Sequence, residues 1–280
     1  MVRFSHSVFA LPFALVATFY AGAGRPALGQ VSLIVVCMVA ARSFAMTFNR
    51  IADAKIDARN PRTASRPLPS GRLSLRQAWV FNIAAAAVFV LGCEAFRRWY
   101  GNPWPLRLFA PTLGLLAAYS VSKRFTSLSH FLLGTAIGFA PLAAWIAIAP
   151  DSLGLPAMLL TGAVLFWIAG FDILYACQDV EIDRRDSLFS IPARLGVAAA
   201  LRISRVSHIL TVALLAGFGF LSEAGWLYWS GLAVTTALLA GEQAVVRPND
   251  LSRVNLAFFT LNGFVSILFA LAAIGDLLLV

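Results

Sequence analysis

Two short acidic motifs contain the residues of this chain best suited to chemistry. The first, NRIADAKID, carries Asn49, Asp53 and Asp57 at intervals of four. Four residues are slightly more than one helical turn, so these side chains should share one helix face. The second motif, DILYACQDVEID, repeats this arrangement at steps of three and four, with one face formed by Asp172, Tyr175, Asp179 and Asp183.

Both motifs lie at the end of a long apolar segment. Carboxylates held together beside a membrane core repel one another, and a shared cation relieves that cost. Hard oxygen ligands suit Mg²⁺, which commonly keeps phosphate among its other partners. A single DxxxD motif is explained as readily by a solvated helix end as by a metal site. Two of them on one side of a small membrane protein can face each other across a cleft, which favours a shared metal and phosphate site.

Two charged residues lie about two helical turns deeper in the apolar segments than Asn49 and Asp179. Arg42 precedes Asn49 by seven residues, and Asp172 precedes Asp179 by seven. A charge at this depth is costly unless it is paired or hydrated. Arg42 and Asp172 therefore either pair with each other or line a polar pocket below the metals, where the arginine could bind a substrate carboxylate.

Basic residues follow the first motif and occur again between the two motifs. In the loop ARNPRTASRPLPSGRLS, the Pro and Gly residues at 67, 69 and 71 favour a folded-back loop. Arg62 and Arg66 are the candidates there for binding phosphate. The later segment YSVSKRFT adds Lys123 and Arg124, and a lysine beside a diphosphate acts as a point charge.

Composition identifies an integral membrane protein. Of 280 residues, 60% are hydrophobic and 12% charged, and the mean hydropathy is +0.80, whereas soluble proteins carry roughly 25% charged residues. A bilayer crossing needs about 20 apolar residues. We expect an all-α, polytopic fold, one integral-membrane domain over 1–280, with about nine spans at 6–23, 31–48, 77–96, 107–121, 130–149, 156–176, 206–221, 225–244 and 255–277.

The charge pattern predicts orientation. With the N-terminus inside, 18 of the 22 Lys and Arg residues fall on the inner side, a strong positive-inside signal. Both motifs and their loops are then cytoplasmic, in a multi-pass protein of the cell inner membrane. The net charge of +9 is explained by topology and anionic headgroups, so we expect a lipid bilayer as partner and no nucleic acid.

Histidine and cysteine suggest no further site. The histidines lack the mutual spacing of a metal set and are interpreted as satisfied side chains near the interface: His6, His130 and His208. The three cysteines fall in or near apolar segments and are interpreted as small buried hydrophobes.

These motifs together resemble those of the UbiA-type intramembrane aromatic prenyltransferases. NRIADAKID is similar to the family's NxxxDxxxD motif, RTASRPLPSG to its following loop, YSVSKRFT to its lysine-arginine element, and DILYACQDVEID to its DxxYAxxDxxxD motif. The resemblance covers essentially the whole chain. Within the family, the sequence most resembles a bacterial branch described as 4-hydroxybenzoate polyprenyltransferase-like. The alternative role for members of that branch is menaquinone synthesis.

The resemblance implies a ring of nine helices around a central cavity open to lipid, with a cytoplasmic cap. It implies Mg²⁺-dependent transfer of a polyprenyl group from its diphosphate to an aromatic ring. Carried over by position, Lys123 contacts diphosphate, and Arg42 and Asp172 lie where the aromatic acceptor binds. The residues matching the metal–diphosphate motifs are Asn49, Asp53, Asp57, Asp179 and Asp183. Arg50 departs from the pattern, since many relatives have aspartate there.

The functional expectation is therefore prenylation of an aromatic acid, 4-hydroxybenzoate first, in quinone biosynthesis. A naphthoate-type acceptor in menaquinone synthesis is one alternative. A secondary transporter is another, although its site should centre near the middle of the bilayer. The proton released by the acceptor could pass to Asp53 or to Asp172, and the sequence leaves this choice open.

Overall fold

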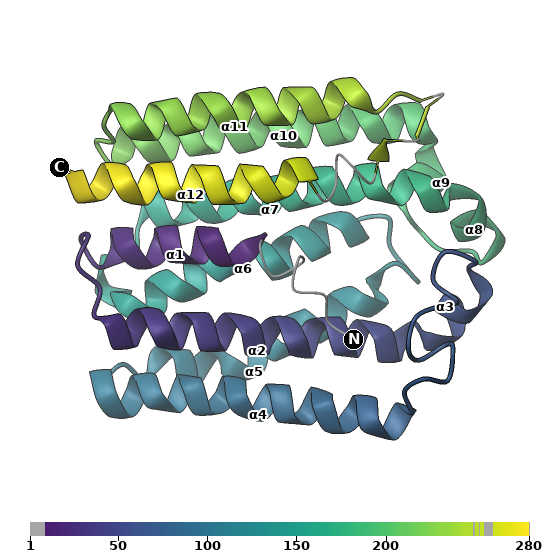
Figure 1. Ribbon diagram of the computed structural model, residues 1–280, viewed down its shortest axis with the longest axis horizontal. Helices are drawn as coiled ribbons and strands as arrows, with labels where there is room; N and C mark the ends of the chain where they lie inside the picture. The colour runs from purple at the N-terminus through teal and green to yellow at the C-terminus, as the bar shows by residue number, and fades with distance from the viewer. Residues whose placement is uncertain (1–8, 249, 252, 255–259, 280) are drawn as a thin grey trace.

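The computed structural model describes residues 9–248, 250–251, 253–254 and 260–279. Over these residues the fold is all-helical, and a single bridge between Arg247 and Asp250 is the one β-type pairing. The long helices run side by side (Figure 1). They are α1 (Ala10–Ala21), α2 (Leu28–Ala52), α4 (Leu75–Tyr100), α5 (Trp104–Ser122), α6 (Ser129–Ile148), α7 (Leu155–Ala176), α10 (Val197–Leu221), α11 (Trp226–Val245) and α12 (Asn262–Leu279).

Each predicted span overlaps one of these helices, although residues 6–8 and 255–259 lie outside the described part of the chain. The largest difference is α10, which begins at Val197 rather than at 206. Its first turns expose Arg202 and Arg205, so hydropathy alone did not reveal them. Six helices of the described residues are long and apolar enough to cross a membrane. The total of nine crossings stays a prediction.

Local sequence explains where these helices begin and end. At the start of α4, the Ser74 hydroxyl accepts a hydrogen bond from the Gln77 N–H at 3.2 Å, and the Gln77 side chain accepts one from the Ser74 N–H at 2.9 Å. This reciprocal pair is a capping box. The same helix ends at Gly101, whose φ of 66° is a left-handed conformation that glycine adopts at little cost.

Close packing joins α6 to α7. A Cβ atom added to Gly134 would lie 2.5 Å from the Leu165 carbonyl oxygen, and one added to Gly138 would lie 2.8 Å from the Leu165 Cα. Small residues at these two positions therefore let the two backbones approach directly, as is common between membrane helices. This contact fixes α6 against the helix that carries the second acidic motif.

Short elements form a cap at one end of the bundle (Figure 1). They are α3 (Ala54–Arg59), the 3₁₀ turn η3 (Cys177–Asp179), α8 (Val180–Arg185) and α9 (Ile191–Leu195). The loop after α3 folds back, as predicted, because Leu73 N–H donates to the Pro67 carbonyl at 3.0 Å and Gly71 takes a φ of 73°. The segment before α9 is tied to the end of α5 by a 2.7 Å bond from Phe189 N–H to the Lys123 carbonyl.

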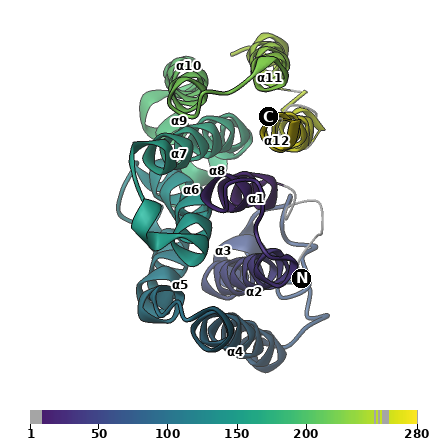
Figure 2. The same ribbon diagram turned by 90° about the vertical axis from the view of Figure 1, so that its left-hand side faces the viewer.

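Viewed end-on, the helices form three groups (Figure 2). Helices α2, α4 and α5 lie on one side, α10, α11 and α12 on the other, and α1, α6 and α7 between them. The buried aromatic core lies among the middle group and α10–α12, and includes Phe13, Trp167, Phe218 and Phe269. The opposite side of the middle group borders a large cavity.

Candidate active site

A cavity of about 1470 Å³ opens beneath the cap. Its described lining residues come from α1, α2, α4, α5, α6 and α7 and from the cap. Away from the cap the lining is apolar, with side chains such as Phe96, Ile137, Leu142 and Ala147. Near the cap it is strongly charged. The cavity can therefore hold a molecule with a polar head and an oily tail.

The first acidic motif enters this cavity where α2 gives way to α3. The helix is interrupted at Asp53, which ends α2 and precedes α3 with φ −95° and ψ 6°. Asn49 donates to the Asp53 carboxylate at 3.4 Å. Asn49, Asp53 and Asp57 all line the cavity, so the three side chains share one wall although the helix that carries them is broken.

The second motif contains the same kind of interruption. Helix α7 ends at Ala176, η3 follows, and Asp179 precedes α8 with φ −106° and ψ 7°. Asp172, Tyr175, Asp179 and Asp183 all line the same cavity as the first motif. The two motifs thus meet at one site beneath the cap.

Asp53 and Asp57 are each held by cations. The Lys123 Nζ lies 2.8 Å from the Asp53 carboxylate, and an Arg124 nitrogen lies 3.4 Å from it and 2.6 Å from the Ala52 carbonyl. Asp57 accepts two 2.7 Å bonds from Arg66. Of the residues that we predicted as site residues, Arg124 alone is not part of the cavity lining.

Asp179 is bound by residues of the loop that follows the first motif. Arg62 donates to both of its carboxylate oxygens, through Nε at 3.1 Å and through Nη2, and also to the Tyr175 hydroxyl at 2.9 Å. Asn60 donates to the same carboxylate at 3.3 Å. These contacts join the loop that follows the first motif to the second motif, across more than a hundred residues of sequence.

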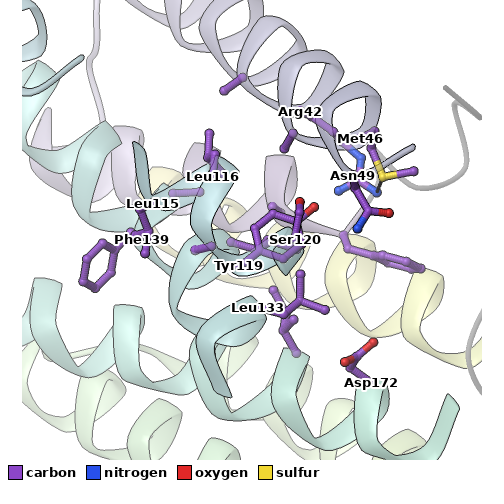
Figure 3. Close-up of a pocket in the computed structure, with 18 of the residues that line it drawn as sticks. Arg42, Met46, Asn49, Leu115, Leu116, Tyr119, Ser120, Leu133, Phe139 and Asp172 are labelled. Atoms are coloured by element: carbon purple, nitrogen blue, oxygen red, sulfur yellow. Dashed lines mark hydrogen bonds between the residues drawn. The ribbon is translucent and has the colours of Figure 1, made fainter. Parts of the chain in front are cut away.

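Arg42 and Asp172 lie on separate walls of the cavity (Figure 3). The sequence allowed them to pair with each other, but no ion pair joins them in the described structure. The Arg42 guanidinium lies 3.9 Å from the Met46 sulfur, and its buried Nε has no hydrogen-bond partner among the described residues. Asp172 instead pairs with His130, at 2.7 Å from Nδ1. Arg42 thus remains a cation in the cavity wall with no carboxylate partner in the described part of the chain.

Sequence reasoning missed several polar residues of this site. Asn60 and Thr63 line the cavity beside the first motif. Both belong to the loop ARNPRTASRPLPSGRLS that follows this motif. His130, set aside because of its spacing from the other histidines, contacts Asp172. Its only sequence signal was its closeness to the YSVSKRFT segment. Arg50, noted as a departure, lies 3.9 Å from Asp57.

The oxygen donors of this site are of the kind that binds a hard divalent cation. Within the described residues, no three acidic, histidine or cysteine side chains already form a metal cluster. Instead, Asp53, Asp57 and Asp179 hold basic side chains, and Asp183 has no such ion pair among the described residues. Carboxylate and amide oxygens gathered in one cavity are ligands of the type that Mg²⁺ prefers. The surrounding arginines and lysine provide the charge to bind phosphate.

Comparison with known proteins identifies the family. A model of the UbiA prenyltransferase family matches residues 10–268. The chain belongs to the UbiA prenyltransferase family. It is therefore a prenyltransferase, and with its apolar helices a multi-pass membrane protein. Membership confirms the resemblance seen in the acidic motifs and excludes a transporter as the family assignment.

The similar proteins include 4-hydroxybenzoate octaprenyltransferase of Serratia proteamaculans (strain 568), with 31% identity over 84% of this chain and 78% of that protein. A 4-hydroxybenzoate solanesyltransferase of Synechocystis sp. is also 31% identical, over 79% and 73%. Among solved structures, a UbiA homolog from Aeropyrum pernix K1 has a TM-score of 0.88 and 32% identity over 99% of both chains.

A UbiA homolog from Archaeoglobus fulgidus, solved with GPP and Mg²⁺, has a TM-score of 0.68 and 20% identity, over 98% of this chain and 96% of that one. At this identity the likeness establishes the fold alone. Together the comparisons confirm the all-helical UbiA fold.

Proposed function

We propose that this UbiA-family protein transfers a polyprenyl group from polyprenyl diphosphate to the ring of 4-hydroxybenzoate, with Mg²⁺ as cofactor, in ubiquinone biosynthesis. The observation that carries the proposal is the contact of Arg62 with Asp179, because it joins the basic loop after the first motif to the second motif, in the cavity that both motifs line. Relatives named as 4-hydroxybenzoate polyprenyltransferases support the substrate pair. Because most basic residues lie at the cap end, we assign that end to the cytoplasmic side of the inner membrane.

Residues of both motifs would hold the metal. Bound Mg²⁺ would neutralise the charge that builds on the diphosphate as the allylic C–O bond breaks. Lys123, Arg62 and Arg66 lie against the same carboxylates and would bind the remaining phosphate oxygens. The proposed metal-binding residues are Asn49, Asp53, Asp57, Asp179 and Asp183.

The apolar part of the cavity suits the polyprenyl tail. Each CH₂ group removed from water gains about 0.8 kcal/mol, so a long tail favours this environment strongly. A site without bulk water also protects an allylic cation from premature hydrolysis.

The deeper polar residues suit the aromatic acid. Arg42 would bind its carboxylate, since the described structure gives this guanidinium no acidic partner. Of the two candidate proton acceptors, Asp53 is already engaged by Lys123 and Arg124. Asp172 lies opposite Arg42 across the cavity (Figure 3), on the side to which the hydroxyl end of the acceptor would point. We therefore assign the proton to Asp172.

A product assay tests this function. Purified protein in liposomes is given octaprenyl diphosphate and 4-hydroxybenzoate, a dihydroxynaphthoate or a phenol without a carboxylate, with Mg²⁺ or with EDTA. The proposal predicts a prenylated hydroxybenzoate and released diphosphate only with Mg²⁺. Asp179→Ala should lower turnover by orders of magnitude while the protein stays folded. A preference for the naphthoate would identify a naphthoate-type acid as the acceptor instead. Normal turnover in EDTA or by Asp179→Ala would contradict the proposed metal site.

A further inference from the structure

His130 contacts Asp172, the proposed base. The His130 Nδ1 lies 2.7 Å from the Asp172 Oδ2. The histidine side chain is 5% exposed and that of Asp172 is 24% exposed. Both residues line the cavity, and the aspartate is the more exposed member of the pair. No hydrogen bond from another described residue occupies its Oδ1.

The other side of the imidazole fixes its protonation. Ile191 N–H donates to the His130 Nε2 at 3.3 Å. Because a backbone N–H can only donate, Nε2 must be the unprotonated nitrogen. The hydrogen therefore sits on Nδ1 and is donated to Asp172, and the ring is neutral. This histidine cannot itself take a proton on Nε2 without losing the Ile191 contact.

We propose that His130 is a positioning residue of prenyl transfer: its Nδ1–H holds Asp172 Oδ2, so that Oδ1 faces the hydroxyl of the acceptor. The inference rests on the proposed function, in which Asp172 receives the acceptor's proton. A second partner that fixes tautomer and orientation is the usual way to keep a catalytic group in place. Here the reacting group is the carboxylate and the orienting group is the imidazole.

The step balances as follows. In prenyl transfer, the phenolic proton moves to Asp172 Oδ1, and the electron pair that it leaves on oxygen forms a carbonyl. The π pair of the neighbouring ring carbon then forms the bond to the allylic carbon. The electrons of the broken allylic C–O bond leave with the diphosphate. The released diphosphate takes the proton from that ring carbon, and Asp172 returns its own proton to the oxygen. The ring is aromatic again, and one proton is released per diphosphate.

The same contact links the base to the diphosphate end of the cavity. Ile191 follows the segment whose Phe189 N–H is bound to the Lys123 carbonyl. Lys123 in turn contacts Asp53. His130 thus lies between the cap segment and the acceptor pocket, which explains how a buried histidine of α6 can orient a carboxylate of α7.

Two substitutions of His130 test its two hydrogen bonds separately. The amide of asparagine falls where Nδ1 lies, so His130→Asn keeps a donor toward Asp172. The amide of glutamine falls where Nε2 lies, so His130→Gln keeps an acceptor for Ile191 and loses the donor. Both variants are assayed for kcat and KM with each substrate, using 4-hydroxybenzoate and 3-fluoro-4-hydroxybenzoate.

We expect His130→Gln to lower kcat by roughly tenfold to a hundredfold, which is part of the usual contribution of general-base catalysis. KM for the prenyl diphosphate should not change. His130→Asn should recover part of the loss. The loss in His130→Gln should be smaller with the fluorinated acid, because its hydroxyl ionises more readily and depends less on a base. Equal losses in both variants, or a loss independent of acceptor acidity, would overturn the proposal.

A second measurement does not depend on turnover. In protein labelled with ¹⁵N-histidine, assigned by its disappearance in His130→Asn, the His130 signals should show a protonated Nδ1 and an unprotonated Nε2. The opposite tautomer or an imidazolium would overturn the proposal. If the wild-type protein prenylates no aromatic acid, the proposed function fails instead, and the ¹⁵N result still decides the geometry of the pair.

Discussion

At the scale of single residues, the site is a set of carboxylates neutralised by basic side chains that a bound diphosphate can engage. Arg62 shows the strength of this pairing. Burial acts to lower its pKa, but its hydrogen bonds and charge pairing with Asp179 outweigh burial and raise the pKa. The guanidinium of Arg62 therefore stays charged beside Asp179. The spacing of the motifs predicted which acidic residues line the cavity. The pairing of His130 with Asp172 depends on how α6 packs on α7, which no local pattern encodes.

Arg42 provides a prediction at this scale. Replacing it by Met should raise KM for 4-hydroxybenzoate about tenfold to a hundredfold, since a hydrogen bond to a charged group contributes roughly 1.5–3 kcal/mol. KM for the prenyl diphosphate should stay close to that of the wild type. Steady-state kinetics with each substrate varied in turn provide the measurement.

Arg42→Lys is the matched control for that experiment. It keeps the positive charge and loses the planar fork, so it should recover part of the acceptor affinity. A change in diphosphate KM with no change in acceptor KM would place Arg42 at the other end of the substrate.

At the scale of elements, two helix interruptions position the site. Asp53 and Asp179 take nearly the same backbone angles, and each joins a long helix to a short cap helix. The apolar pattern predicted the long helices well, because membrane spans are set by length and hydropathy. It could not predict the interruptions, since neither involves Pro or Gly. The likeness of the two joints matches the likeness of the two acidic motifs.

The contact between α6 and α7 also makes a testable prediction. Gly138→Ala should lower the thermal stability of the purified protein, because the added methyl meets the Leu165 backbone and overpacking costs about 1–3 kcal/mol. Gly114→Ala on α5 is the matched control, since nothing lies within 4 Å of its added Cβ. That control should be neutral or stabilising. Thermal unfolding in one detergent compares the three proteins, and equal destabilisation by both substitutions would contradict the packing account.

At the scale of the whole molecule, the cap occupies one end of the helical bundle (Figure 1), and the ion pairs of Asp53, Asp57 and Asp179 lie at that end. Composition predicted a membrane protein, and family membership confirms it. The sequence did not predict how the helices divide around the cavity, with α10–α12 contributing none of its described lining, because lipid-facing and protein-facing apolar surfaces look alike in sequence. A single domain over 1–280 stays a prediction.

Orientation is testable by cysteine accessibility, because the three native cysteines are buried. Glu181→Cys lies on the cap and Asp151→Cys in the turn η2 (Pro150–Ser152) at the opposite end of α7, and both positions are exposed. In intact spheroplasts, a membrane-impermeant maleimide should label only the Asp151→Cys variant. After permeabilisation, it should label both variants. Wild-type protein controls for background. The reverse labelling would place the cap outside.

The central claim is that both acidic motifs bind one metal–diphosphate unit. The most direct test is Mn²⁺ binding, followed by electron paramagnetic resonance, to purified protein with a non-reacting geranyl thiodiphosphate. We predict tight Mn²⁺ binding that requires the thiodiphosphate and is lost in Asp53→Asn and in Asp179→Asn alike. Wild-type binding by either variant would contradict the account.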